Sequence, residues 1–155
     1  KDARLLFGLA FESLVGIKEV GGNNRGEIVE EIQKTIGSAE REPWCMATVQ
    51  SCLAYAEKKT EIKSAIFPSE HVRTVWANTP ASLRVKYSPL KYAVVCWGRD
   101  NSTAGHTGIL VENNKPAFMS VEGNVSGEGP EGVYYKKRHF IRNGSLYVLG
   151  FLRPF

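Results

Sequence analysis

The sequence predicts an α+β protein in which N-terminal helices pack on an antiparallel β-sheet. In the first half of the chain, apolar residues recur at helical spacing, as Leu5, Leu6, Leu9 and Leu14 do. In the second half, short β-rich runs are separated by Gly, Asn or Pro. Helices followed by consecutive strands are typical of the α+β class. The length of 155 residues and the 43% hydrophobic content fit a single domain over residues 1–155.

Four helical segments are expected in the first half. The first begins near Asp2, its predicted N-cap, and ends by Gly16. The second spans residues 27–36, follows the Gly- and Asn-rich connection at residues 21–26, and ends at Gly37. The third runs from about residue 45 to residue 58, with Pro43 just ahead of it. A short helical segment is expected within residues 70–76.

Five strands are expected in the second half, at residues 92–97, 107–111, 117–121, part of 134–141, and 146–152. No internal repeat, low-complexity run or linker divides the sequence. The longest apolar stretch, residues 5–17, is interrupted by Glu12 and Ser13 and is too short to span a bilayer. We therefore expect no integral membrane segment.

The net charge of +4 and the isoelectric point near 9.0 favour anionic partners such as nucleic acid, acidic lipid or an anionic cell wall. The basic residues are dispersed, apart from one dense cluster at residues 136–138 (KKR) beside Tyr134 and Tyr135. A solvated strand face or loop is the simpler interpretation of this cluster. A basic and aromatic groove for a polymer is the alternative.

The three cysteines do not form a recognisable metal-binding pattern. No CxxC motif and no Cys/His pair has zinc spacing, so neither a metal site nor a cofactor is expected. Cys52 and Cys96 lie among apolar neighbours and are predicted to be buried core thiols. Reduced cysteines throughout suit a protein made in the cytoplasm.

Cys45 differs from the other two cysteines because it stands at the expected N-terminus of the third helix. Free backbone amides and the helix dipole at such a position favour an anion, and thus the reactive thiolate. Taken alone, a cysteine that enters an apolar helix is more often a core residue than a nucleophile. A nucleophilic role also needs a proton acceptor within hydrogen-bond reach.

A predicted hairpin supplies that acceptor. If residues 113–115 form a three-residue loop, Leu110 faces Phe118 and His106 faces Glu122. Because side chains on one strand face recur at every second position, Asn124 follows on the same side as Glu122. Glu122 would hold one imidazole nitrogen and leave the other to take a proton from Cys45.

Asn124 would polarise the Glu122 carboxylate or help to fix the imidazole. Each of these residues also has a plain alternative: a surface histidine for His106, and a turn for residues 122–124. Each alternative is common by itself, but their joint occurrence beside a helix-entry cysteine favours a cysteine nucleophile.

The combination of segments resembles the CHAP-type peptidoglycan hydrolases, which are cysteine amidases and endopeptidases with a papain-like fold. The resemblance covers most of the chain and follows the order of that family. Its segments are residues 17–26 (IKEVGGNNRG), 43–47 (PWCMA), 105–108 (GHTG), 122–124 (EGN) and 149–154 (LGFLRP). The resemblance implies Cys45 as nucleophile, His106 as base, and Glu122 with Asn124 as supporting polar residues.

The resemblance also implies the substrate and the place of action. The enzyme would cleave an amide bond of bacterial peptidoglycan, as an endopeptidase or an N-acetylmuramoyl-L-alanine amidase. It would act on the cell wall, from the periplasm, from outside the cell or after release at phage lysis. We expect a monomer, no nucleic-acid partner, and no separate wall-binding domain within these residues.

The chain departs from the family pattern at Trp44. Many members carry Gln immediately before the nucleophile, where it can help to form the oxyanion hole. The Trp-Cys form resembles a subgroup found in phage lysins (endolysins) and bacterial wall enzymes. The Cys45 amide is therefore the first candidate donor and Asn24 the second, while Trp44 and Trp97 are candidate substrate-groove residues. Asp occurs only at positions 2 and 100, so the calcium loop of some members is not expected.

Two other functions remain open from the sequence. The basic and aromatic run at residues 134–138 is compatible with a wall-binding module that keeps the fold without catalysis. An acyltransferase would use the same nucleophile but pass the acyl group to an amine instead of water.

Overall fold

The computed structural model describes residues 2–85, 88–127 and 129–155, and it confirms the α+β class. Within these residues, four α-helices and a short 3-10 helix precede or flank a seven-stranded antiparallel sheet. The helices are α1 (Ala3–Glu12), α2 (Glu27–Thr35), α3 (Cys45–Thr60), α4 (Val72–Asn78) and the 3-10 helix η1 (Ala81–Leu83). The strands are β1 (Arg84–Val85), β2 (Val94–Arg99), β3 (Gly105–Asn114), β4 (Ala117–Gly127), β5 (Gly129–His139), β6 (Arg142–Asn143) and β7 (Leu146–Leu152).

The helix ends follow local capping signals. The side chain of Asp2 accepts a hydrogen bond from the amide of Leu5, which caps α1 as predicted. Gly37 adopts a φ of 76° just after α2, a left-handed conformation that glycine adopts without steric cost. The predicted starts of α1, α2 and α3 are confirmed to within one residue.

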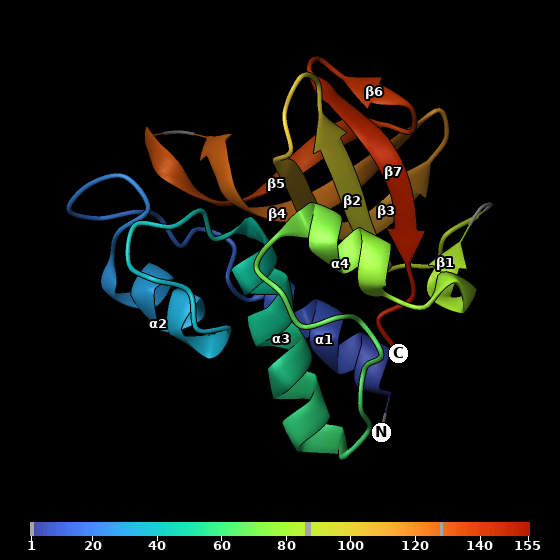
Figure 1. Cartoon of the computed structure of the whole chain (residues 1–155), viewed down its shortest axis with the longest axis horizontal. Coiled ribbons are helices and arrows are strands. Elements are labelled where there is room, and N and C mark those ends of the chain that lie inside the picture. The colour runs from blue at the N-terminus through green and yellow to red at the C-terminus, as the bar shows by residue number, and fades with distance from the viewer. Residues whose placement is uncertain (1, 86–87, 128) are drawn as a thin grey trace.

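The strand order of the sheet is β1-β7-β2-β3-β4-β5, and the short β6 pairs with β7. β2 to β5 therefore form an antiparallel meander, and β7 returns to lie beside β2 (Figure 1). Two short strands, β1 and β6, were not predicted, because two-residue strands carry no period that a sequence can show. β4 and β5 are longer than predicted, with eleven residues each.

Helices cover one face of the sheet. α1 packs against α3, and α3 packs against β3 and β4 (Figure 1). The core on this side joins helix residues such as Phe7 and Met46 to sheet residues such as Ile109 and Val121. The other face of the sheet carries a second, smaller core built around Trp97, and its members are Ala93, Val95, Trp97, Leu110, Phe118, Leu146 and Phe151.

Gly123 marks the point where β4 and α3 come closest. A Cβ placed there would lie 2.5 Å from Oγ1 of Thr48, so a larger residue would push the helix away from the strand. This contact brings the first turn of α3 against β4. In the described residues, no helix combines the length and apolarity needed to cross a membrane.

Candidate active site

Cys45 is the first residue of α3, and Trp44 is its N-cap residue. The Cys45 side chain belongs to the helix-side core, with only 7% of the residue exposed. Backbone N–H groups in the first turn of a helix have no partner within the helix. The thiol therefore lies beside amides that favour negative charge, on the helix that packs against β3 and β4.

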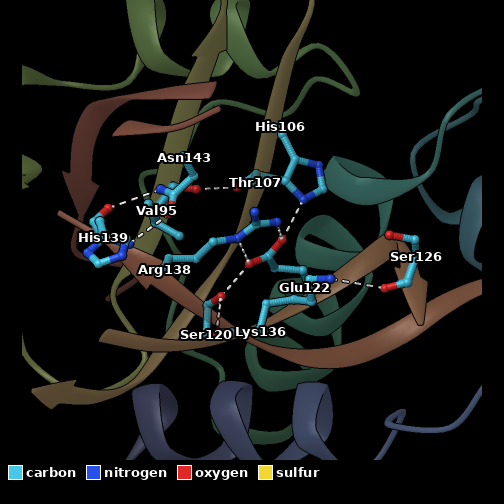
Figure 2. Close-up of polar contacts among 10 residues, drawn as sticks. All are labelled: Val95, His106, Thr107, Ser120, Glu122, Ser126, Lys136, Arg138, His139 and Asn143. Atoms are coloured by element: carbon cyan, nitrogen blue, oxygen red, sulfur yellow. Dashed lines mark hydrogen bonds and ion pairs between the residues drawn. The ribbon is translucent and has the colours of Figure 1, made fainter. Parts of the chain in front are cut away.

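His106 lies near the start of β3 and turns one ring nitrogen toward Glu122. The distance from Nε2 of His106 to Oε1 of Glu122 is 2.8 Å (Figure 2). Because an ionised carboxylate only accepts hydrogen bonds, Nε2 must carry the proton of this bond. Nδ1 is then the nitrogen left to face the Cys45 thiol, whose interaction with the imidazole raises the pKa of His106.

The surroundings of His106 favour its charged form. Burial acts to lower the pKa of His106, but contacts with Cys45 and Glu122 outweigh it and raise the pKa from 6.5 to about 9. Trp97, its cross-strand partner on β2, stacks on the imidazole with 5.5 Å between the ring centroids. The ring is thus fixed by a carboxylate at one edge and an aromatic face at its side.

Glu122 is fully buried and surrounded by donors. Nε and Nη2 of Arg138 contact its two carboxylate oxygens, with 2.9 Å from Nε to Oε2. The hydroxyl of Ser120 donates to Oε2 as well (Figure 2). Burial acts to raise the pKa of Glu122, but Arg138 and His106 outweigh it and lower the pKa to about 2. The carboxylate stays ionised at neutral pH and accepts from four donor groups.

The predicted hairpin register is wrong, although the predicted contact exists. The loop consists of two residues, Lys115 and Pro116, because β3 continues to Asn114. Leu110 pairs with Ser120 instead of Phe118, and Val111 is an extra residue in a β-bulge. From Leu110 back to the start of β3 the shift is two residues, so His106 and Glu122 stay on the shared face that the sequence predicted. Beyond the bulge, where Glu112 pairs with Met119, the shift is three residues.

Gly108 is the residue that the observed register brings opposite Glu122. A Cβ at Gly108 would lie 2.5 Å from Cγ of Glu122 and 2.6 Å from the backbone oxygen of Val121. The missing side chain leaves room for Glu122 to lean along the strand and reach His106 diagonally. The sequence showed the glycine within the GHTG segment but not this steric role.

Asn124 reaches the same surface as His106 but does not support the imidazole. The pairing of β4 with β5 shifts between Glu122 and Val125, and Asn124 adopts a left-handed φ of 58° at this bulge. Among the described residues, its side chain makes no hydrogen bond to His106 or Glu122, and its buried Oδ1 has no partner. The predicted role in polarising Glu122 is therefore not seen in the geometry; Arg138 and Ser120 occupy that position.

The side chains of Trp44 and Asn24 are already bonded elsewhere. Trp44 is fully buried, and its Nε1 donates to Oε2 of Glu19 at 2.9 Å, so it does not line a substrate groove. Nδ2 of Asn24 donates to the backbone oxygen of Arg41 at 3.0 Å. These bonds connect the loop at residues 21–26 to the segment before α3. Of the two predicted oxyanion donors, only the Cys45 amide, at the start of α3, is not bonded to another residue in the described part of the chain.

Trp97 is fully buried between His106 on one side and Phe118 on the other. Its Nε1 has no hydrogen-bond partner among the described residues. The guanidinium of Arg138 lies over its ring at 5.2 Å. Trp97 therefore packs against His106 and Arg138. It does not line an open substrate groove, which is the role that the sequence analysis considered for it.

Arg138 is the site residue that sequence reasoning missed. It was interpreted as part of a solvated basic cluster, but its side chain is largely buried against Glu122. Its neighbours in β5 alternate, with Lys137 and His139 exposed and Lys136 half-buried on the side of Arg138. A strand period of two through residues 136–139 is the signal that could have separated Arg138 from Lys137.

Cys52 and Cys96 are buried as predicted, and burial raises the pKa of each thiol to about 12. They are inert core thiols at neutral pH. In the described part of the chain, no cluster of three His, Cys, Asp or Glu side chains is arranged to hold a metal ion.

No profile of a known protein family matches this chain, and no curated protein sequence matches it either. A thiol at a helix N-terminus, an imidazole with a fixed tautomer and a buried carboxylate are the groups that nucleophilic acyl transfer requires.

Proposed function

We propose that this chain is a cysteine hydrolase of the CHAP type that cleaves an amide bond in bacterial peptidoglycan. The observation that carries the proposal is the continuous series from Cys45 through His106 to the buried Glu122. It joins three elements that are far apart in the sequence and orders them as nucleophile, base and orienter. The α+β fold with helices on an antiparallel sheet agrees with the papain-like resemblance.

In the proposed reaction, the Cys45 thiolate attacks the amide carbonyl carbon and the carbonyl oxygen becomes an oxyanion. The Cys45 backbone amide at the start of α3 is the proposed donor to that oxygen. When the intermediate collapses, the C–N bond breaks and Nδ1–H of His106 gives its proton to the leaving nitrogen. A thioester remains on Cys45.

Water completes the cycle. Nδ1 of His106 takes a proton from the water as its oxygen attacks the thioester carbon. The C–S bond then breaks, which releases a carboxylic acid and restores the thiolate beside the imidazolium. Glu122 keeps the imidazole in one orientation in both half-reactions, and Arg138 keeps Glu122 ionised.

Two features support peptidoglycan as the substrate. The five sequence segments that resemble the CHAP hydrolases include both Cys45 and His106. The net charge of +4 favours contact with an anionic cell wall. We further propose that the protein acts at the bacterial wall as a monomer.

Clearance of purified cell walls by the Cys45→Ala variant tests the proposal. We expect the variant to bind walls but to lose turbidity clearance, while mass spectrometry of wild-type digests shows one type of amide bond cut. Cys52→Ala is the matched control, because it removes another thiol from the same helix. The raised pKa of the Cys52 thiol keeps it protonated and therefore unreactive. Undiminished clearance by Cys45→Ala would refute the enzymatic proposal and favour a wall-binding module.

Digestion in the presence of an added amine separates hydrolysis from acyl transfer. A hydrolase gives carboxylic acid products whether or not the amine is present. A transferase gives products heavier by the mass of the amine less one water.

A further inference from the structure

The wall beside His106 contains a small polar pocket that the proposed reaction does not use. Its volume is about 210 Å³, and its lining includes His106, Asn124, Arg99, Lys136 and Glu131. Cys45 is not part of the lining. The pocket therefore borders the imidazole but not the thiol.

Two cations in this pocket lack a carboxylate partner. Among the residues that the structure describes, neither Arg99 nor Lys136 forms an ion pair. Nη1 of Arg99 contacts the Ser145 hydroxyl at 3.3 Å. Nζ of Lys136 donates to the backbone oxygen of Ser126 at 3.1 Å (Figure 2). Both bonds hold the charged ends in place without neutralising them.

Among the described residues, the other charges on the pocket lining do not cancel this excess. Arg138 also lines the pocket, but its charge is balanced by Glu122. Glu131 is the single carboxylate on the described lining, against the two free cations. The pocket is thus built for a group with net negative charge.

We propose that this pocket is a subsite for a carboxylate on the leaving half of the substrate, bound by Arg99 and Lys136. The assignment to the leaving half rests on the proposed function. His106 protonates the leaving nitrogen through Nδ1, so the departing amine lies against the imidazole, which also borders the pocket. Charge-assisted hydrogen bonds from a guanidinium and an ammonium are the contacts that a carboxylate favours.

The class of substrate follows from this placement. The leaving fragment is an amine that carries a carboxylate within about one residue of the scissile nitrogen, because the pocket adjoins the imidazole directly. Glu131 at the rim would repel a second carboxylate and accept a hydrogen bond from an amide or ammonium group of the same fragment. Conversion of the substrate carboxylate to a carboxamide removes the charge that Arg99 and Lys136 recognise.

Direct binding to the Cys45→Ala variant tests this subsite without turnover. The probes are a synthetic stem tetrapeptide with free carboxylates and the same peptide with its carboxylates converted to carboxamides. We expect calorimetry to give about tenfold tighter binding of the carboxylate form. The preference should vanish when Arg99→Gln and Lys136→Gln are added, and should largely return with Arg99→Lys and Lys136→Arg.

Lys137→Gln is the matched control, since it removes the same charge from the adjacent residue on the exposed side of β5. Equal affinity for the two peptides, or an equal loss of preference with Lys137→Gln, would overturn the subsite. Wall clearance by the unmodified chain is measured in parallel. A preference for the carboxylate peptide without wall clearance would refute the proposed hydrolase but support the anion site. Wall clearance without this preference would support the hydrolase and refute the anion site.

Discussion

Nε2 of His106 bonds to Oε1 of Glu122 at 2.8 Å, although the pairing of β3 with β4 does not place the two residues opposite each other. Gly108 stands opposite Glu122 instead, and its missing side chain leaves the space that the carboxylate crosses. The orientation of the proposed base thus depends on an empty position on the strand. This relationship makes Gly108 a positioning residue of the site.

Gly108→Ala should impair the site through sterics alone. The added methyl group would meet both Cγ of Glu122 and the backbone of Val121, so the two strands must separate or Glu122 must turn away from His106. We expect a loss of about 1–3 kcal/mol in the free energy of unfolding. We also expect slower alkylation of Cys45 by iodoacetamide at neutral pH, because a displaced imidazole no longer stabilises the thiolate.

Thermal unfolding and the alkylation rate measure the two effects separately. Asn113→Ala, on the exposed end of the same strand, is the control and should change neither. Wild-type stability and alkylation in Gly108→Ala would contradict the steric role of this position.

Arg138→Ala should cost far more than the loss of a surface charge. The substitution leaves the fully buried Glu122 without its bidentate partner. Removal of one member of a buried pair typically costs about 3–5 kcal/mol, because the other charge stays buried and unpaired. Chemical denaturation of Arg138→Ala beside Lys137→Ala measures the difference, since Lys137 is exposed on the opposite side of β5. Equal, small losses in the two variants would show that Arg138 does not support Glu122.

The pKa of His106 predicts that stability declines in mild alkali. Its folded-state pKa lies at about 9, above the ordinary value of 6.5. The protonated imidazole therefore contributes stability that is complete below pH 6.5 and is lost as the pH rises through about 9. Glu122, with its pKa lowered from 4.5 to about 2, contributes stability that is complete above pH 4.5 and is lost as the pH falls from there through about 2.

Urea unfolding between pH 6 and about pH 9.5 measures the alkaline decline. His106→Gln should flatten it, because glutamine has no proton to lose in this range. The buried thiols of Cys52 and Cys96, with pKa values of about 12, titrate above this window. An unchanged decline in His106→Gln would assign the effect to another group.

The sequence predicted the position of Cys45 and the shared face of His106 and Glu122 correctly, although it predicted the length of the hairpin loop incorrectly. The start of α3 follows from Pro43 and the apolar helix after it, which are local signals. The hairpin loop was predicted one residue too long and the bulge at Val111 was not foreseen. Between the bulge and the start of β3 the register error was two residues, and a shift of two keeps His106 and Glu122 on one face.

Residues whose role depends on distant pairing could not be predicted in the same way. Arg138 joins the site because it pairs with Phe118 across β4 and β5, and a run of three basic residues hides which one points inward. Trp44 looked available to a substrate groove and Asn24 as a donor because their acceptors, Glu19 and Arg41, lie in segments with no periodic pattern. Hydrogen bonds between loops leave no spacing rule in a sequence.

Trp44→Phe distinguishes an anchor from a catalytic donor. The indole of Trp44 is fully buried and donates to Glu19, which is itself buried, so phenylalanine would leave a carboxylate oxygen without that donor. We expect a loss of about 1–3 kcal/mol in the free energy of unfolding. The rate of wall clearance per folded molecule should stay within about twofold of wild type, because the backbone amide of Cys45 is unaffected. Glu19→Gln should give a smaller loss, since the amide oxygen still accepts the indole N–H. A fall in clearance of a hundredfold or more with unchanged stability would instead make Trp44 a donor to the oxyanion, since removal of such a donor costs about that much in rate.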